Sequence, residues 1–172
     1  MLKEQGMFRR LELKLSSYMQ ISETPGIKRY SALIIGHSGD SWIWIIGLSL
    51  IWLFGKDSLN ATACTMIISI FITTVVTFII KSVVQRERPV GKRGYLYRKT
   101  DPFSFPSGHA ARGAAITTVS LWICPLWITL LLAVWTSLLC LTRVVLKIHY
   151  VSDMLAGIGV GAAVALLVLQ LY

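Results

Sequence analysis

The sequence predicts an all-α protein, a multi-span transmembrane helix bundle preceded by an amphipathic interfacial helix. Hydrophobic residues make up 55% of the 172-residue chain and charged residues only 15%, whereas a soluble domain carries about 25% charged residues. The mean hydropathy is +0.66, and the apolar residues fall in long runs rather than in alternating patches. The length suits one domain over residues 1–172, with an amphipathic segment at 1–26 and a transmembrane core at 41–171.

The first 22 residues have the pattern of an amphipathic helix. Apolar side chains recur at helical spacing, and they are Phe8, Leu11, Leu15 and Tyr18. Basic residues lie off that stripe, as expected for a helix in the membrane interface. A solvated helix that docks one face on the protein is the alternative. The turn-forming residues Thr24, Pro25 and Gly26 then end the pattern.

Five apolar segments predict the membrane spans, although the first of them is short. They are Ser41 to Gly55, Leu59 to Ile80, Ser107 to Cys124, Leu126 to Leu141 and Tyr150 to Leu171. Residues 27–40 are mixed, and residues 81–105 form a polar, basic loop. Counting the crossings places this loop, residues 143–149, Asp40 and the N-terminus on one face of the membrane. That arrangement is expected of a single site at one interface.

The formal net charge is +9, which favours an anionic partner. Because the basic residues flank membrane spans, anionic lipid headgroups or an anionic substrate explain the charge better than nucleic acid does. The three cysteines, Cys64, Cys124 and Cys140, lie inside apolar stretches without the spacing of a metal site. The sequence therefore predicts neither a metal nor another cofactor, and it gives no sign of an obligate protein partner.

Three polar clusters meet on the predicted face. Lys81, Arg88 and Arg143 supply positive charge, and ammonium and guanidinium groups hold a phosphate dianion well. Ser107 and Gly108 open the third span. A helix N-terminus presents backbone N–H groups to an anion, and glycine lets the backbone approach it closely. These residues are therefore candidates for a phosphate-binding cradle.

Two histidines accompany this cradle. His149 and Asp153 are four residues apart, so on a helix they share a face. A carboxylate beside an imidazole fixes its tautomer and stabilises its cationic form, which makes the other ring nitrogen of His149 a candidate nucleophile. His109 lies one turn inside the cradle helix and is a candidate general acid for a leaving alkoxide.

Together these clusters resemble the signature of the type 2 phosphatidic acid phosphatase family, which shares a superfamily with vanadium haloperoxidases and glucose-6-phosphatase. The signature has three blocks: Lys, six residues, Arg-Pro; then Pro-Ser-Gly-His; then Ser-Arg, five residues, His, three residues and Asp. The chain shows all three in order between residues 81 and 153. One position departs from the signature, since Thr142 stands in place of Ser; a hydroxyl is kept.

The resemblance implies a role for each matching residue. His149 would attack phosphorus and carry a phosphohistidine, Asp153 would orient it, and His109 would protonate the leaving group and then activate water. The phosphoryl oxygens would be held by Lys81, Arg88, Ser107, Gly108 and Arg143. No metal is implied, because cationic side chains take its place.

Further polar residues lie near the motifs without belonging to them. Arg112, one turn past Gly108, is a candidate contact for a second phosphate or the lipid headgroup, or else forms a structural ion pair. His37 and Asp40 lie on the same face and contact either a headgroup or the protein itself. A basic cluster in the loop either grips a headgroup or is solvated, and it comprises Lys92, Arg93, Arg98 and Lys99.

The sequence therefore predicts an integral membrane phosphatase that hydrolyses a lipid phosphate monoester or diphosphate. Polyisoprenyl diphosphate, lipid A 1-phosphate, phosphatidylglycerol phosphate and phosphatidic acid are the candidate substrates. A lipid phosphotransferase with the same phosphohistidine and a non-enzymatic lipid-phosphate binder are the alternatives. The compact chain favours a bacterial cell membrane. Fifteen near-face basic residues favour a cytoplasmic active face, whereas many family members act on the opposite face, so the sequence leaves the face open.

Overall fold

The computed structural model describes residues 2–19, 21, 24–56, 58–89 and 101–171. Within these ranges the chain is all-helical, as predicted. The helices are α1 (Leu2–Met19), α2 (Ile27–His37), α3 (Ser41–Phe54), α4 (Ser58–Val84), α6 (Gly108–Ile123), α7 (Leu126–Val145) and α8 (Val151–Leu169). An isolated β-bridge between Glu87 and Phe103 joins the two ends of the loop that follows α4.

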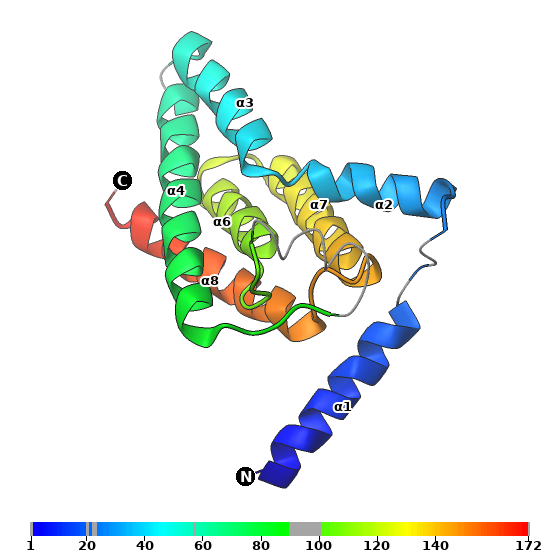
Figure 1. Cartoon of the computed structure of the whole chain (residues 1–172). Coiled ribbons are helices and arrows are strands. Elements are labelled where there is room, and N and C mark those ends of the chain that lie inside the picture. Colours follow the sequence, from blue (N-terminus) through cyan, green and yellow to red (C-terminus); the bar gives the residue numbers. More distant parts are fainter. Residues whose placement is uncertain (1, 20, 22–23, 57, 90–100, 172) are drawn as a thin grey trace.

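Helix α6 lies inside the bundle and packs against α4, α7 and α8 (Figure 1). Its first half is built from small residues, and those buried there are Gly108, Ala110, Ala111, Gly113, Ala114 and Ala115. Small side chains let helix backbones approach closely in a membrane, where association depends on packing rather than on the hydrophobic effect. The start of α6, where the second motif block lies, is thereby held among three other helices.

The closest helix approach is between α6 and α8. A β-carbon on Gly161 would lie 1.9 Å from the carbonyl oxygen of Ala111, and one on Gly157 would lie 2.5 Å from that of Ser107. Glycine is the residue that permits this contact, because it has no β-carbon. The same approach brings the first turn of α8 to the start of α6, where the Ser107 N–H donates to the carbonyl of Asp153 at 3.0 Å.

Three of the described helices are each long and apolar enough to cross a membrane: α4, α7 and α8. Helices α2 and α3 are together long and apolar enough to form one span, with a bend of 51° at their junction. Helix α6 corresponds to the remaining predicted span, but its 16 residues extend about 24 Å, less than the hydrocarbon core of about 30 Å. The chain is thus a multi-span membrane protein with three or four spans of full length and a short helix among them.

The junction of α2 and α3 falls in the polar run from Gly36 to Asp40, within the segment of mixed composition at 27–40. Ile27–His37 forms a helix, and the predicted span from Ser41 becomes the second arm of a bent pair. Two indole N–H groups hold the bend: that of Trp44 donates to the Ser38 carbonyl and that of Trp135 to the Ser38 hydroxyl, both at 2.9 Å. The polar turn is therefore satisfied within the protein rather than at its surface.

Helix α1 extends away from the bundle and touches it through a polar face (Figure 1). Glu12 and Ser16 are buried there, whereas Leu15 and Tyr18 of the predicted apolar stripe are exposed. The side chains of Phe8 and Leu11 lie outside the described residues. The two described stripe residues, Leu15 and Tyr18, therefore do not dock on the protein.

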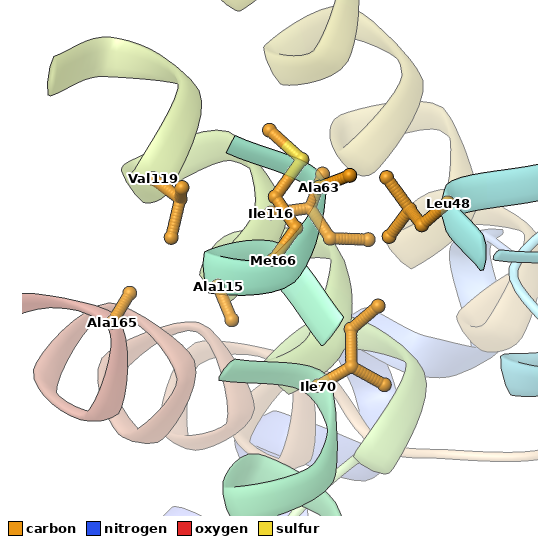
Figure 2. Packing of buried hydrophobic residues seen from close by; sticks show 8 residues of the cluster. All are labelled: Leu48, Ala63, Met66, Ile70, Ala115, Ile116, Val119 and Ala165. Atoms are coloured by element: carbon orange, nitrogen blue, oxygen red, sulfur yellow. The ribbon is translucent and has the colours of Figure 1, made fainter. Parts of the chain in front are cut away.

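Large apolar side chains cover the outside of the bundle, which agrees with a lipid environment. Examples with more than half of their surface exposed are Phe54, Phe71, Phe78, Trp122, Trp127 and Leu167. Smaller residues dominate the interior. Figure 2 shows the main cluster, drawn from α3, α4, α6 and α8, which comprises Leu48, Ala63, Met66, Ile70, Ala115, Ile116, Val119 and Ala165.

Candidate active site

Six of the predicted site residues line one cavity of about 430 Å³, and they are Lys81, Arg88, Gly108, His109, Arg112 and His149. The other five lie outside its lining, and they are Ser107, Arg143, Asp153, His37 and Asp40. The cavity lies between the end of α4, the start of α6, and the segments 101–103 and 148–149. The polar side chains in its wall include Lys81, Arg88, Asp101, His109, Arg112 and His149. The three motif blocks, separated in sequence by up to about 70 residues, are thus brought to one place.

Two cations of the first block share one carboxylate that the sequence prediction missed. Asp101 accepts a hydrogen bond from Lys81 Nζ at 2.5 Å and forms an ion pair with Arg88 Nη2 at 2.8 Å. The Nε–H of Arg88 also donates to the Asp101 carbonyl at 2.8 Å. A carboxylate held by two such donors shows that they converge on one oxyanion position, as a phosphoryl group requires. Asp101 is the one acidic residue between Arg88 and Asp153, and that isolation in a basic loop was the signal.

His149 is buried, and each of its two ring nitrogens lies within hydrogen-bonding distance of a polar group. Its Nδ1 lies 2.8 Å from the carbonyl oxygen of Ser104 and 3.5 Å from Asp153 Oδ2. Both are acceptors, so Nδ1 carries the proton. Its Nε2 lies 3.1 Å from Arg88 Nη1, a group that only donates. The lone pair of Nε2 therefore faces the cation of the first block, which is the orientation a nucleophile needs.

Burial lowers the pKa of His149 to about 4, and nearby Arg88 acts in the same direction, while the hydrogen bond to Asp153 opposes both. The neutral ring, with a proton on Nδ1 alone, is therefore the resting form at neutral pH. The prediction had Asp153 alone orienting the ring. The shorter contact is made by the Ser104 carbonyl, whose residue is itself fixed by a hydrogen bond from its N–H to the Arg86 carbonyl at 2.8 Å.

Asp153 is held from the other side by Arg86, a second residue that the sequence prediction left without a role. Arg86 Nη1 donates to Asp153 Oδ1 at 2.8 Å, and the Tyr150 N–H donates to Oδ2 at 2.9 Å. Arg86 also pairs with Glu12 of α1, and Glu12 accepts from the Ser152 hydroxyl. Helix α1 is thus linked through one arginine to the carboxylate next to His149.

His109 has a carboxylate partner of its own, supplied by the bend between α2 and α3. Its Nε2 donates to Asp40 Oδ1 at 2.9 Å, and His37 Nδ1 donates to Oδ2 at 3.0 Å. Arg143 Nη2 lies 3.6 Å from Asp40 Oδ1 and donates to the Gly36 carbonyl at 2.7 Å. Asp40 therefore contacts other groups of the protein, which is one of the two roles that the sequence left open for it, the other being contact with a headgroup.

Glycine allows the bend to come this close. A β-carbon on Gly39 would lie 2.6 Å from both methyl carbons of Leu139 and 3.2 Å from His109 Cδ2. The signal in the sequence was the polar run from Gly36 to Asp40 next to an apolar arm, but its spacing from the motif blocks gave no sign of contact with His109.

The remaining motif hydroxyls have local structural partners. The Ser107 hydroxyl caps α6 by accepting from the Ala110 N–H at 3.4 Å, and the Thr142 hydroxyl donates to the Leu139 carbonyl at 2.7 Å. Gly108 opens the helix at the cavity wall, beside the head group of Arg112. The basic loop cluster formed by Lys92, Arg93, Arg98 and Lys99 lies outside the described residues.

The sequence pattern of the PAP2 superfamily matches residues 62–172, a stretch that contains all three motif blocks. This match places the chain among membrane phosphatases that act on lipid phosphates. The protein belongs to the PAP2 superfamily, which confirms the resemblance seen in the motifs.

Individual relatives agree with this assignment. An undecaprenyl-diphosphatase from Sulfolobus acidocaldarius is 27% identical over 172 residues, covering 98% of this chain and 81% of the relative. The crystal structure of a PAP2-type phosphatidylglycerolphosphate phosphatase from Bacillus subtilis has a TM-score of 0.78 at 20% identity, covering 96% of this chain and 86% of that one. The structure of Aquifex aeolicus LpxE has a TM-score of 0.75 at 21% identity, covering 93% and 95%. At these identities the two structures support the fold.

Proposed function

We propose that this protein hydrolyses a lipid phosphate monoester or diphosphate through a phosphohistidine on His149, without a metal. The observation that carries the proposal is the position of His149 Nε2, an unprotonated nitrogen 3.1 Å from Arg88 at the wall of a cationic cavity. The names of the relatives support a lipid substrate, because they include an undecaprenyl-diphosphatase and a phosphatidylglycerolphosphate phosphatase.

In the first step the substrate phosphoryl group replaces the Asp101 carboxylate on Lys81 and Arg88. The lone pair of His149 Nε2 attacks phosphorus, and the bond from phosphorus to the leaving oxygen breaks with its electron pair on that oxygen. The positive charge that develops on the imidazole is stabilised by the Nδ1–H contacts to the Ser104 carbonyl and Asp153. The cationic side chains neutralise charge on the equatorial oxygens.

His109 supplies the proton that an alkoxide leaving group needs. Its Nε2 donates to Asp40, so the doubly protonated ring is stabilised by that carboxylate and carries a transferable proton on Nδ1. In the second step the neutral ring takes a proton from water as the water attacks the phosphohistidine. The nitrogen–phosphorus bond breaks, and inorganic phosphate and free His149 are released.

The lipid tail can leave the cavity sideways. Thr74, Phe78 and Phe103 line its apolar side, and Phe78 on α4 is mostly exposed on the outer surface of the bundle. An acyl or isoprenyl chain lying along α4 would therefore remain in lipid while its phosphate reaches the cations. The organisms of the named relatives support placement in a prokaryotic cell membrane.

The test is phosphate release by the detergent-purified protein, with EDTA present, over the four candidate lipids. His149→Gln keeps a polar side chain without the imidazole and is expected to abolish release. Ser137→Ala, at an exposed position on α7, is the matched control and should keep full activity. Release that depends on added metal would refute the metal-free mechanism. Transfer of phosphate to an acceptor lipid, without release to water, would establish the phosphotransferase instead.

A further inference from the structure

Arg112 lies in the wall of the active-site cavity, one helical turn beyond Gly108 on α6. A β-carbon on Gly108 would lie only 3.0 Å from Arg112 Nη1, so the guanidinium packs against the backbone of that glycine. The cavity wall therefore holds Arg112 in addition to Lys81 and Arg88, the two motif cations that line it.

Among the described residues, the acidic side chains around the cavity bond to other cations rather than to Arg112. Lys81 and Arg88 share Asp101, and Arg143 lies near Asp40. In the part of the chain that the structure describes, Arg112 forms no hydrogen bond or ion pair, and its Nε is buried without an acceptor. A buried guanidinium without an acceptor is costly, which indicates that an anionic ligand supplies one.

The contacts of Asp101 indicate which part of a ligand that is. Asp101 occupies the position of the phosphoryl group under attack and contacts Lys81 and Arg88. The guanidinium of Arg112 lies beside Gly108 instead, although its backbone is about 6 Å further along the helix axis. A group bound by Arg112 is therefore a neighbour of the phosphoryl group under attack, on the substrate side of it.

We propose that Arg112 binds the tail-proximal phosphate of a lipid diphosphate and so makes this site a diphosphatase. This inference rests on the proposed function and names its substrate class. His149 Nε2 bonds to the terminal phosphorus, the bond from that phosphorus to the bridging oxygen breaks, and its electron pair leaves on the tail-proximal phosphate. Arg112 stabilises the charge that this leaving phosphate gains.

The experiment compares two substrates with the same short isoprenyl tail, one a diphosphate and one a monophosphate. Arg112→Gln should lower kcat/KM for the diphosphate by about 10- to 150-fold, as expected for one charged hydrogen-bonding group, and should change the monophosphate value little. Arg112→Lys should recover part of the loss. Lys28→Gln, which removes an exposed cation on α2, is the control and should affect neither substrate.

Inhibition by inorganic pyrophosphate and inorganic phosphate provides a second measurement. Pyrophosphate should inhibit the wild-type protein more strongly than phosphate does, and Arg112→Gln should remove that difference. Equal losses on both lipid substrates, or no change on either, would overturn the inference while leaving the proposed hydrolysis intact. A wild-type protein that hydrolyses neither lipid would instead refute the proposed function, and this inference with it.

Discussion

Replacing Gly161 by alanine should destabilise the protein and impair its site, although the residue touches no substrate. The new β-carbon would lie 1.9 Å from the Ala111 carbonyl oxygen and 2.7 Å from the carbonyl carbon. Both contacts are with backbone, so no side-chain rotation can relieve them. Helix α8 must move away from α6 by roughly 1.5 Å before contacts of the ordinary 3.4 Å are restored.

The magnitude follows from two opposing effects. Overpacking of a tight interface costs about 1–3 kcal/mol, and occasionally more, while alanine in a helix is favoured over glycine by about 0.5–1 kcal/mol. The clash with backbone places this substitution at the upper end of the first range, so we expect a net loss of about 2–2.5 kcal/mol. Activity should fall as well, because the same interface aligns Ser107 with Asp153 at 3.0 Å.

Gly159 provides the control, since a β-carbon there meets nothing within 4 Å. Gly159→Ala should raise stability slightly through helix propensity and leave activity unchanged. Thermal unfolding in detergent and phosphate release measure the two effects on the same preparations. Equal stability of the Gly159→Ala and Gly161→Ala proteins would refute the close α6–α8 packing.

Three further predictions concern the two histidines and helix α1. First, burial lowers the pKa of His149 to about 4, so the loss of kcat/KM on acidification should occur near pH 4 rather than near pH 6.5. The free energy of unfolding should also fall as the pH drops from about 6.5 to 4, because the unfolded chain takes up the proton first. Second, Asp40→Asn should lower kcat, because the His109 cation that forms during proton transfer loses its carboxylate; the loss should be smaller than the factor of about 100 or more expected for removal of a general acid. Third, Glu12→Gln should lower the free energy of unfolding by about 1 kcal/mol, because it weakens the partly exposed pair with Arg86; thermal unfolding measures this.

Each of these has a clear opposing result. An acid limb near pH 6.5 in the wild-type protein would show that the His149 ring is solvated in the free enzyme. An Asp40→Asn protein with unchanged kcat would show that its contact with His109 does not support proton transfer. Full stability of Glu12→Gln would mean that α1 does not depend on this ion pair.

The helices and the motif residues were predictable because each leaves a local signal. Long apolar runs predicted α4, α7 and α8, and the fixed spacings within the blocks placed His149, Asp153 and the cations together. The offset of four residues between His149 and Asp153 correctly indicated proximity. It could not show that the Ser104 carbonyl lies closer to the ring than the carboxylate does.

The missed features all depend on contacts between segments distant in sequence. Asp101 joins two cations 20 and 13 residues away, Asp40 reaches His109 across 69 residues, and Glu12 reaches Arg86 across 74. Spacing in the sequence says nothing about such pairs, because they form only once the α2–α3 bend and α1 have docked. The apolar run at 107–124 predicted a helix but not its surroundings: α6 has 16 residues, and its small side chains let it pack inside the bundle.

The most direct test of the central claim is to trap the covalent intermediate. A lipid phosphate labelled on its terminal phosphorus is mixed with the protein in EDTA, the reaction is quenched in alkali, and the bound label is mapped by mass spectrometry. The account predicts a phosphoryl group on His149 in the wild-type protein and no bound label in His149→Gln. Label on another residue, or turnover without label on the protein, would contradict it.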